Sequence, residues 1–229
     1  MKFNTIYLRL LFFFGILFVC IPVTAYSNEA VGWYMKGINL TNAGNYTDAI
    51  QVYDKALTLE PNYFEAWNGK ADVLNRAHLY DQALEASNHS LEINPTYVNG
   101  WIYRGQILYN IGYKYEDQIH DINMANMIYE EQLQAFEKAI EIDPNNAEAW
   151  FNKGYALAGM KRYDEAISAF NKVATLDPLY PNLQANLQIA EKLRDASIPF
   201  YMKYAPVILV VMIFGIGAII WLKFKRKSH

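Results

Sequence analysis

Tryptophan and proline recur at matching intervals through the middle of this chain, and this regularity constrains the fold more than any other feature. The tryptophans stand at positions 33, 67, 101 and 150, and the prolines at 61, 95, 144 and 178. The interval is 34 residues in both series, except for one interval of 49 residues in each. Such a period is typical of a supersecondary unit that is repeated and stacked. The sequence therefore predicts four copies of one unit, with 15 extra residues inside the third.

Small and aromatic residues occupy fixed places between the tryptophan and the proline of a copy. A glycine or alanine follows the tryptophan by four residues and shares its helical face, so a bulky ring beside a small residue lets two helices approach closely. The first copy shows the whole pattern, at Trp33, Gly37, Leu40, Gly44, Tyr46, Ala49, Tyr53, Ala56 and Pro61. The fourth copy repeats it at Trp150, Gly154, Leu157, Tyr163, Ala166, Phe170, Val173 and Pro178.

The other two copies depart from this pattern. The second carries Ser87 and Ser90 where the first carries Tyr53 and Ala56, and we expect it to pack more loosely. The third keeps the pattern on both sides of its insertion. The residues and spacing of residues 30–180 resemble the tetratricopeptide repeat, in which each copy is a helix–turn–helix.

The resemblance implies an all-α fold, a right-handed superhelical solenoid of four tetratricopeptide helix–turn–helix repeats. We place the domain at residues 26–203 and its repeats at 30–63, 64–97, 98–146 and 147–180. Because a terminal repeat leaves a hydrophobic face open, a capping helix is expected, and the apolar spacing after Pro181 places it at 181–197.

The insertion occupies about residues 113–128. Neither proline nor glycine occurs from Lys114 to Asp143, and apolar residues there form a broken helical stripe. We expect the second helix of the third copy to extend backward by several turns and to project past the solenoid, with its stripe against a neighbour or a partner.

The first 25 residues have the pattern of a secretory signal peptide. Lys2 and Arg9 precede an apolar run at positions 10–23, and the small residue Ala25 ends the segment. We expect residues 1–25 to be cleaved after Ala25, with retention as an anchor as the alternative.

A second apolar segment lies near the other end of the chain. Residues 205–222 carry no charge, and at ~1.5 Å per residue they span roughly 27 Å, close to the thickness of a hydrocarbon core. The tail at 223–229 begins with basic residues and is cytoplasmic by the positive-inside rule. We therefore expect one transmembrane helix at 204–222 and repeats outside the plasma membrane. A buried helix of a soluble protein is the alternative, and it does not explain the basic tail.

Charge and cysteine usage agree with an exported domain. Residues 26–203 hold all 23 acidic residues but 14 of the 20 basic ones, a net charge near −9. Nucleic acid is therefore not expected as a partner, because phosphate would be repelled and no basic stripe is present. The single cysteine, Cys20, falls in the expected signal, so no disulfide is expected in the mature domain.

Groups that could support catalysis are few. Outside the tail the histidines are His78, His89 and His120, none of them in a metal-ligand spacing. The best metal candidate lies in the insertion, where a helix would place Asp117 and Asp121 on one face, and it comprises Glu116, Asp117, His120 and Asp121. A solvated charge run is the simpler explanation of this cluster. We predict no enzyme activity, no catalytic residue, no cofactor and no metal site.

The resemblance also implies a binding surface, because the first helix of each tetratricopeptide repeat lines a concave groove. The inward positions near each tryptophan give a candidate peptide- or protein-binding groove formed by Tyr34, Ile38, Thr41, Asn68, Asp72, Asn75, Ile102, Gln106, Tyr109, Phe151 and Tyr155. Amides pair with an extended peptide backbone, and tyrosine supplies contact area at little entropic cost. For Tyr34, Tyr109 and Tyr155, packing between helices is the open alternative.

One ligand type known for the family does not fit. Members that clamp a C-terminal carboxylate carry a lysine followed four residues later by an asparagine on the first helix, and here those places hold Tyr34 and Ile38. We expect an internal stretch of peptide or a folded partner instead.

Three Asn-x-Ser/Thr triplets begin at Asn39, Asn45 and Asn88. In an exported domain such triplets are possible glycan acceptors. Asn45 is the expected site, because it falls in the turn between two helices.

Together these features predict a membrane-tethered scaffold that binds a peptide or protein partner noncovalently at the outer face of the plasma membrane. The alternative is an accessory subunit of a membrane enzyme or secretion complex that makes its contact through the transmembrane helix. A hydrolase with a site in the insertion is a third possibility, and its most concrete form requires the metal cluster described above.

Overall fold

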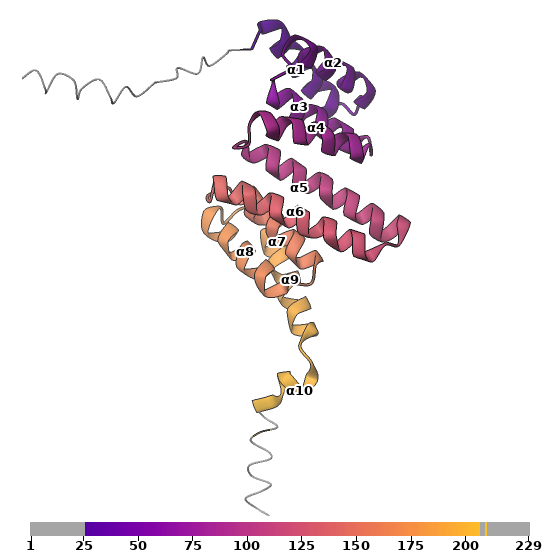
Figure 1. Cartoon of the computed structure of the whole chain (residues 1–229). Coiled ribbons are helices and arrows are strands. Elements are labelled where there is room, and N and C mark those ends of the chain that lie inside the picture. Colours follow the sequence, from indigo (N-terminus) through magenta and orange to yellow (C-terminus); the bar gives the residue numbers. More distant parts are fainter. Residues whose placement is uncertain (1–25, 207–208, 210–229) are drawn as a thin grey trace, which may run out of the picture.

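The computed structural model of this protein describes residues 26–206 and 209. The expected signal at residues 1–25 and most of the expected transmembrane helix and tail (207–208 and 210–229) lie outside the described residues. Within the described part, no helix is both long and apolar enough to span a bilayer. That part contains helices and no strands, and the helices stack in chain order (Figure 1).

The helices form four hairpins followed by a capping helix, which confirms the predicted all-α solenoid. The hairpins are α1 (Asn28–Asn42) with α2 (Tyr46–Leu59), α3 (Phe64–Arg76) with α4 (Tyr80–Ile93), α5 (Val98–Tyr113) with α6 (Ile122–Ile142), and α7 (Ala147–Gly159) with α8 (Tyr163–Leu176). A π-helix, η1 (Lys114–Ile119), extends α5. The chain continues through α9 (Leu183–Ser197) to the short α10 (Phe200–Lys203). Leu183 and Ala190 of α9 are buried against the last hairpin.

The shared period of tryptophan and proline has a direct structural cause. The tryptophans of the second, third and fourth copies each stand six residues beyond a proline and donate the indole N–H to the carbonyl oxygen of that proline. The distances are 2.8 Å for Trp67 to Pro61, 2.8 Å for Trp101 to Pro95 and 2.9 Å for Trp150 to Pro144. One side-chain bond thus closes the connection between consecutive hairpins at each of the three junctions.

Aromatic rings on the second helices press against glycines on the first helices. A Cβ atom on Gly37 would lie 2.6 Å from the ring of Tyr53, and one on Gly69 of the next hairpin would lie equally close to the same ring. Phe136 covers Gly105 in the same way, at 2.4 Å. Real Cβ contacts are essentially never so short, so these positions require glycine for the helices to pack at this separation.

The second copy has Ser87 in place of this ring and Ser90 in place of the alanine three residues later. Ser87 and Ser90 are both fully buried, and the Ser90 hydroxyl donates to the carbonyl oxygen of Phe64 at 2.9 Å. Ser87 Oγ finds no hydrogen-bond partner among the described residues. The looser packing expected of this copy stays a prediction, and a buried hydroxyl without a partner is the feature that favours it.

The insertion lengthens both helices of the third hairpin, which projects beyond its neighbours (Figure 1). Tyr129 corresponds to Tyr46, the first residue of α2, so α6 begins seven residues, or two turns, earlier; the predicted backward extension is confirmed. Assigning the whole insertion to the second helix was wrong. η1 continues the first helix, His120 leaves it in the left-handed region (φ 60°), and the Asp121 carboxylate caps α6 by accepting from the N–H of Met124 at 3.0 Å.

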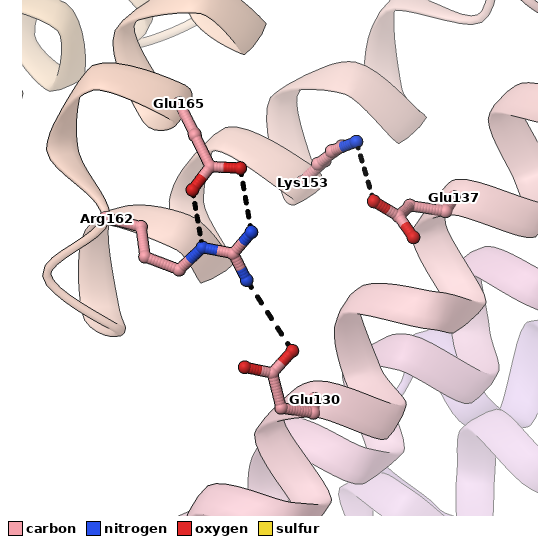
Figure 2. A network of polar contacts seen from close by, with 5 residues as sticks. All are labelled: Glu130, Glu137, Lys153, Arg162 and Glu165. Carbon is pink, nitrogen blue, oxygen red and sulfur yellow. Dashed lines mark hydrogen bonds and ion pairs between the residues drawn. The ribbon is translucent and has the colours of Figure 1, made fainter.

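Ion pairs join the third hairpin to the fourth (Figure 2). Lys153 of α7 lies 2.9 Å from Glu137 of α6, and Arg162 pairs with both Glu165 and Glu130, at 2.7 and 3.5 Å. The same arrangement joins the first two hairpins, where Lys70 lies 2.7 Å from Asp54. These groups are partly exposed, so each pair contributes at most about 1 kcal/mol, and the buried rings carry most of the stability.

A matched pair of substitutions tests the ring-on-glycine contact. Gly105→Ala should lower the free energy of unfolding by about 1–3 kcal/mol, because the new methyl overlaps the Phe136 ring. Gly32→Ala has no heavy atom within 4 Å of the new methyl, so it should instead raise that free energy by about 0.5–1 kcal/mol through helix propensity alone. Urea unfolding followed by circular dichroism measures both, and equal shifts in the two variants would contradict this account of the packing.

Candidate functional site

Several predicted groove residues gather in a hollow near the start of the solenoid, here called the N-terminal hollow. Its volume is about 280 Å³, and it is lined mainly by α1, α3 and α5. The predicted residues that line it are Tyr34, Ile38, Thr41, Asn68 and Asp72. Its other main walls are Tyr53, Glu65, Arg76, Tyr97, Asn99 and Tyr103.

The N-terminal hollow is polar and contains an unpartnered amide. Asn68 is 5% exposed, and its Oδ1 accepts no hydrogen bond from the residues that the structure describes. Beside it, Arg76 Nε lies 3.0 Å from both carboxylate oxygens of Asp72, and this contact raises the pKa of Arg76. A ligand that donates a hydrogen bond, such as a peptide N–H, would satisfy Asn68.

A second hollow of about 480 Å³, here called the C-terminal hollow, lies between α5, α6, α7 and α9. Tyr109 and Tyr155, both predicted, form part of its wall, and their ring centroids are 6.3 Å apart in an edge-to-face arrangement. The Tyr129 ring lies 6.4 Å from that of Tyr109. Tyr109 and Tyr155 are 37% and 50% exposed, so their rings are not fully packed between helices, and their part in binding stays a prediction.

The remaining predicted groove residues line neither hollow. Ile102 is 2% exposed and packs in the core beside Phe136, and the Phe151 ring lies against those of Phe170 and Tyr180. Asn75 accepts from Asn110 Nδ2 at 2.8 Å and joins α3 to α5. Gln106 is half-buried on α5. Packing is therefore the role that the structure gives to Ile102 and Phe151.

Sequence reasoning missed much of the C-terminal hollow. Tyr113, Glu116 and Tyr129 belong to the lengthened hairpin, where the repeat register no longer says which residues face inward. Gln132 and Ile189 come from α6 and α9, whereas the prediction considered first helices only. In the N-terminal hollow, Tyr103 was missed although it stands two residues after Trp101, the position of Gly69 in the previous copy.

The candidate metal ligands have other contacts. Glu116 Oε2 accepts the hydroxyl of Tyr129 at 2.7 Å, and Asp121 caps α6. Because His120 ends the π-helix, Asp117 and Asp121 do not share a helical face, as the continuous helix had predicted. Over residues 26–206 and 209, no group of three or more His, Cys, Asp or Glu side chains is arranged to hold a metal ion.

The isolated histidines are also engaged. His78 occupies the left-handed turn position (φ 61°), and its Nδ1 lies 2.7 Å from the hydroxyl of Tyr80. The ring of His89 lies 4.7 Å from that of Trp67. Asn45 is exposed in the turn before α2, and its glycosylation stays a prediction.

Family comparisons agree with this architecture. Two models described as tetratricopeptide repeat match residues 34–98 and 135–168. The chain contains tetratricopeptide repeats. Most of α5, the insertion and the start of α6 lie between the two matched ranges.

Solved structures of other proteins resemble most of this chain. A thermophilic TPR protein of Thermus thermophilus is 20% identical with a TM-score of 0.61, over 70% of this chain and 80% of that one. MamA of Desulfovibrio magneticus RS-1 is 19% identical with a TM-score of 0.59, over 75% and 88%. YrrB, described as a TPR protein with an unusual peptide-binding site, is 21% identical with a TM-score of 0.53, over 73% and 79%. At these identities the likeness concerns the fold alone.

A curated relative matches a short segment. Photosystem I assembly protein Ycf3 of Parasynechococcus marenigrum (strain WH8102) is 43% identical over 42 residues, which are 18% of this chain. The match covers 24% of that protein, so the chain spans about a quarter of the relative's length.

Buried tyrosines of the tetratricopeptide core make the free energy of unfolding depend on pH in the alkaline range. Burial raises the pKa of Tyr53 from 10.0 to about 12. Below pH 10 the folded and unfolded states are both protonated and stability is complete. Above pH 10 the unfolded chain loses this proton while the folded chain keeps it, so stability should fall between pH 10 and 12, by up to about 2–3 kcal/mol for this one group.

Tyr53→Phe tests this linkage, because it removes the titrating hydroxyl and keeps the ring over Gly37. Urea midpoints of wild type and variant should run parallel from about pH 7 to 9, and the variant should lose less stability from pH 10 to 12. An identical alkaline loss in both proteins would show that Tyr53 does not contribute.

Proposed function

We propose that this chain is a membrane-tethered scaffold that binds an extended segment of a partner protein noncovalently, at the outer face of the plasma membrane. Tetratricopeptide repeats are protein–protein interaction modules, which supports the scaffold role. The binding surface is the groove, defined here as the N-terminal and C-terminal hollows together.

The observation that carries the proposal is the buried amide of Asn68 in the N-terminal hollow. An acceptor that is 5% exposed and without a protein partner costs about 1–3 kcal/mol, and a peptide N–H would recover that free energy on binding. The tyrosines of the C-terminal hollow add broad, partly exposed faces that suit side chains of a bound segment. The groove therefore offers polar pairing at one end and aromatic contact at the other.

The same residues disfavour a C-terminal carboxylate as the ligand. Tyr34 stands where a carboxylate-clamping member carries its lysine, and its ring lies 5.1 Å from that of Tyr63. The nearest guanidinium, that of Arg76, is already paired with Asp72. An internal segment of the partner fits this surface better.

The tether is argued from the sequence. The uncharged stretch at 205–222 and its basic tail support a membrane span, and the pattern at 1–25 supports export. Assembly of an envelope or secretion complex is the process we assign to the scaffold. The matched segment of Photosystem I assembly protein Ycf3 belongs to a protein named for assembly, in agreement with this role.

Crosslinking in native membranes tests the groove. A photoreactive residue in place of Asn99, an exposed position of α5 that lines the N-terminal hollow, should capture a partner. Asn68→Ala or Tyr155→Ala should reduce the yield about tenfold, the effect of losing about 1.4 kcal/mol of binding. Gln51→Ala, at an exposed position on α2, is the control and should leave the yield unchanged. If instead the partner is lost only when residues 204–222 are exchanged for an unrelated span, the accessory-subunit alternative holds.

Protease accessibility tests the orientation. Protease added to intact cells should digest residues 26–203 and leave an epitope at the tail protected until the membrane is permeabilised. Protection of the repeats in intact cells would reject the outward placement. This result would not bear on whether the groove binds a partner.

A further inference from the structure

The C-terminal hollow is walled by tyrosine faces. Tyr109, Tyr113 and Tyr155 are 37%, 49% and 50% exposed, and Tyr129 stands beside them with its centroid 6.4 Å from that of Tyr109. Each tyrosine ring carries negative potential on its faces, which attracts a cation within about 6 Å of the ring centroid. Rings converging from α5, α6 and α7 therefore form an electron-rich wall.

A carboxylate completes this wall. Glu116 Oε2 accepts the hydroxyl of Tyr129 at 2.7 Å, and Glu116 lies on the π-helix that extends α5. The π-helix forms the C-terminal end of the lengthened first helix, and it brings an acidic side chain from the insertion into a hollow whose other walls are α5, α6, α7 and α9.

Gly112 holds the Tyr129 ring in place. A Cβ atom there would lie 2.5 Å from Cε1 of Tyr129, so only glycine lets the ring approach α5. Gly112 corresponds to Gly44, which has a positive φ in the turn of the first hairpin, but α5 continues helically through Gly112. The glycine thus serves the aromatic wall and not a turn.

The charge of the hollow is uncompensated. Glu116 is the one carboxylate among the described residues that line it, and no lysine, arginine or histidine among them lines it. The N-terminal hollow differs in that a cation, Arg76, lines it and pairs with Asp72, although Glu65 lines it too and its Oε2 accepts no hydrogen bond from the described residues. An anionic ligand would be repelled by Glu116, and a purely apolar ligand would cover that carboxylate without pairing it.

We propose that the C-terminal hollow binds a lysine or arginine side chain of the partner segment, with the cation against the tyrosine faces and paired with Glu116. This inference rests on the proposed function, because it names the chemistry that the groove selects. The side-chain stem would lie along Ile189 and the alanines of α7, and the peptide backbone would continue toward Asn68.

The inference can be tested without knowing the partner. The full-length protein in detergent carries 3-fluorotyrosine at position 109, and its ¹⁹F signal is followed during titration with Nα-acetyl-lysine methylamide. The matched probe is the norleucine derivative, which has the same stem without the ammonium group. The lysine probe should shift the signal saturably, with an affinity of millimolar order, and bind about tenfold more tightly than the norleucine probe.

Two neighbouring substitutions separate the specific carboxylate from bulk charge. Glu116→Gln should weaken lysine binding about tenfold, whereas Asp117→Asn, one residue further along the same π-helix and outside the hollow, should change it less than about twofold. Both positions are exposed, so neither variant should lose helicity by circular dichroism.

Three results would overturn the inference: equal binding of the lysine and norleucine probes, equal effects of the two substitutions, or no saturable shift at all. Choline that binds more tightly than the lysine probe would assign the hollow to a small ammonium compound and reject the polypeptide side chain. Because no partner is needed, failure here leaves the crosslinking result standing. If the lysine probe binds as expected but the groove variants still capture the partner in the crosslinking experiment, only the proposed function is rejected.

Discussion

The stack depends on aromatic rings that lie where a Cβ atom would have to be. Tyr53 shows the constraint most fully, because its ring touches Gly37 in its own hairpin and Gly69 in the next and so fixes two helix separations at once. Phe136 on Gly105 and Phe170 on Gly154 hold the third and fourth hairpins closed. With these distances set, the indoles of Trp67, Trp101 and Trp150 each donate to the carbonyl of the proline six residues earlier. These hydrogen bonds stabilise the junctions between hairpins. The groove follows from this regular stacking, because first helices form most of its walls, and α6 and α9 complete the C-terminal hollow.

The third hairpin uses the same contact for a different purpose. In place of a turn at Gly112, the chain continues through α5 into η1, and Gly112 instead receives the ring of Tyr129. The turn moves to His120, which takes the left-handed conformation that Gly44, His78 and Lys161 take in the other hairpins. A shift of the turn by eight residues lengthens both helices and brings Glu116 to the groove. The insertion therefore changes the surface of the third hairpin but keeps the contact between an aromatic ring and a glycine beneath it.

The sequence predicts the stack well because each of its signals is tied to a contact that recurs. Trp67, Trp101 and Trp150 each make the same kind of hydrogen bond. Gly37, Gly105 and Gly154 each receive an aromatic ring in the same way, so a pattern seen in one copy carries over to the next. The groove is predicted only in part, because inward-facing positions were counted from the tryptophans. That count places Asn68, Asp72 and Tyr109 on the walls of the hollows, where the structure has them. It also includes Ile102, which is buried in the core, and Phe151, which is partly buried against neighbouring rings. It fails at Tyr113 because α5 continues there, where the other copies turn. It fails at Glu116 because a π-helix has more residues per turn than the roughly 3.6 on which the count depends.

The two hollows differ in which of their polar groups lack a partner within the protein, and this difference makes the two ends of the groove chemically distinct. At the N-terminal hollow the Asp72 carboxylate is already paired with Arg76. The groups left without a partner among the described residues are the Asn68 amide oxygen, which any peptide backbone could fill, and Glu65 Oε2. At the C-terminal hollow the backbone groups are helical and what remains open is a charge beside aromatic faces, which only particular side chains suit. Backbone pairing gives affinity with little choice of sequence, whereas a charged pocket selects a residue type and fixes the register of the segment. In the proposed arrangement the selective end is also the end nearer α9 and the span, so the register would be set closest to the membrane, where an assembly scaffold must position its partner.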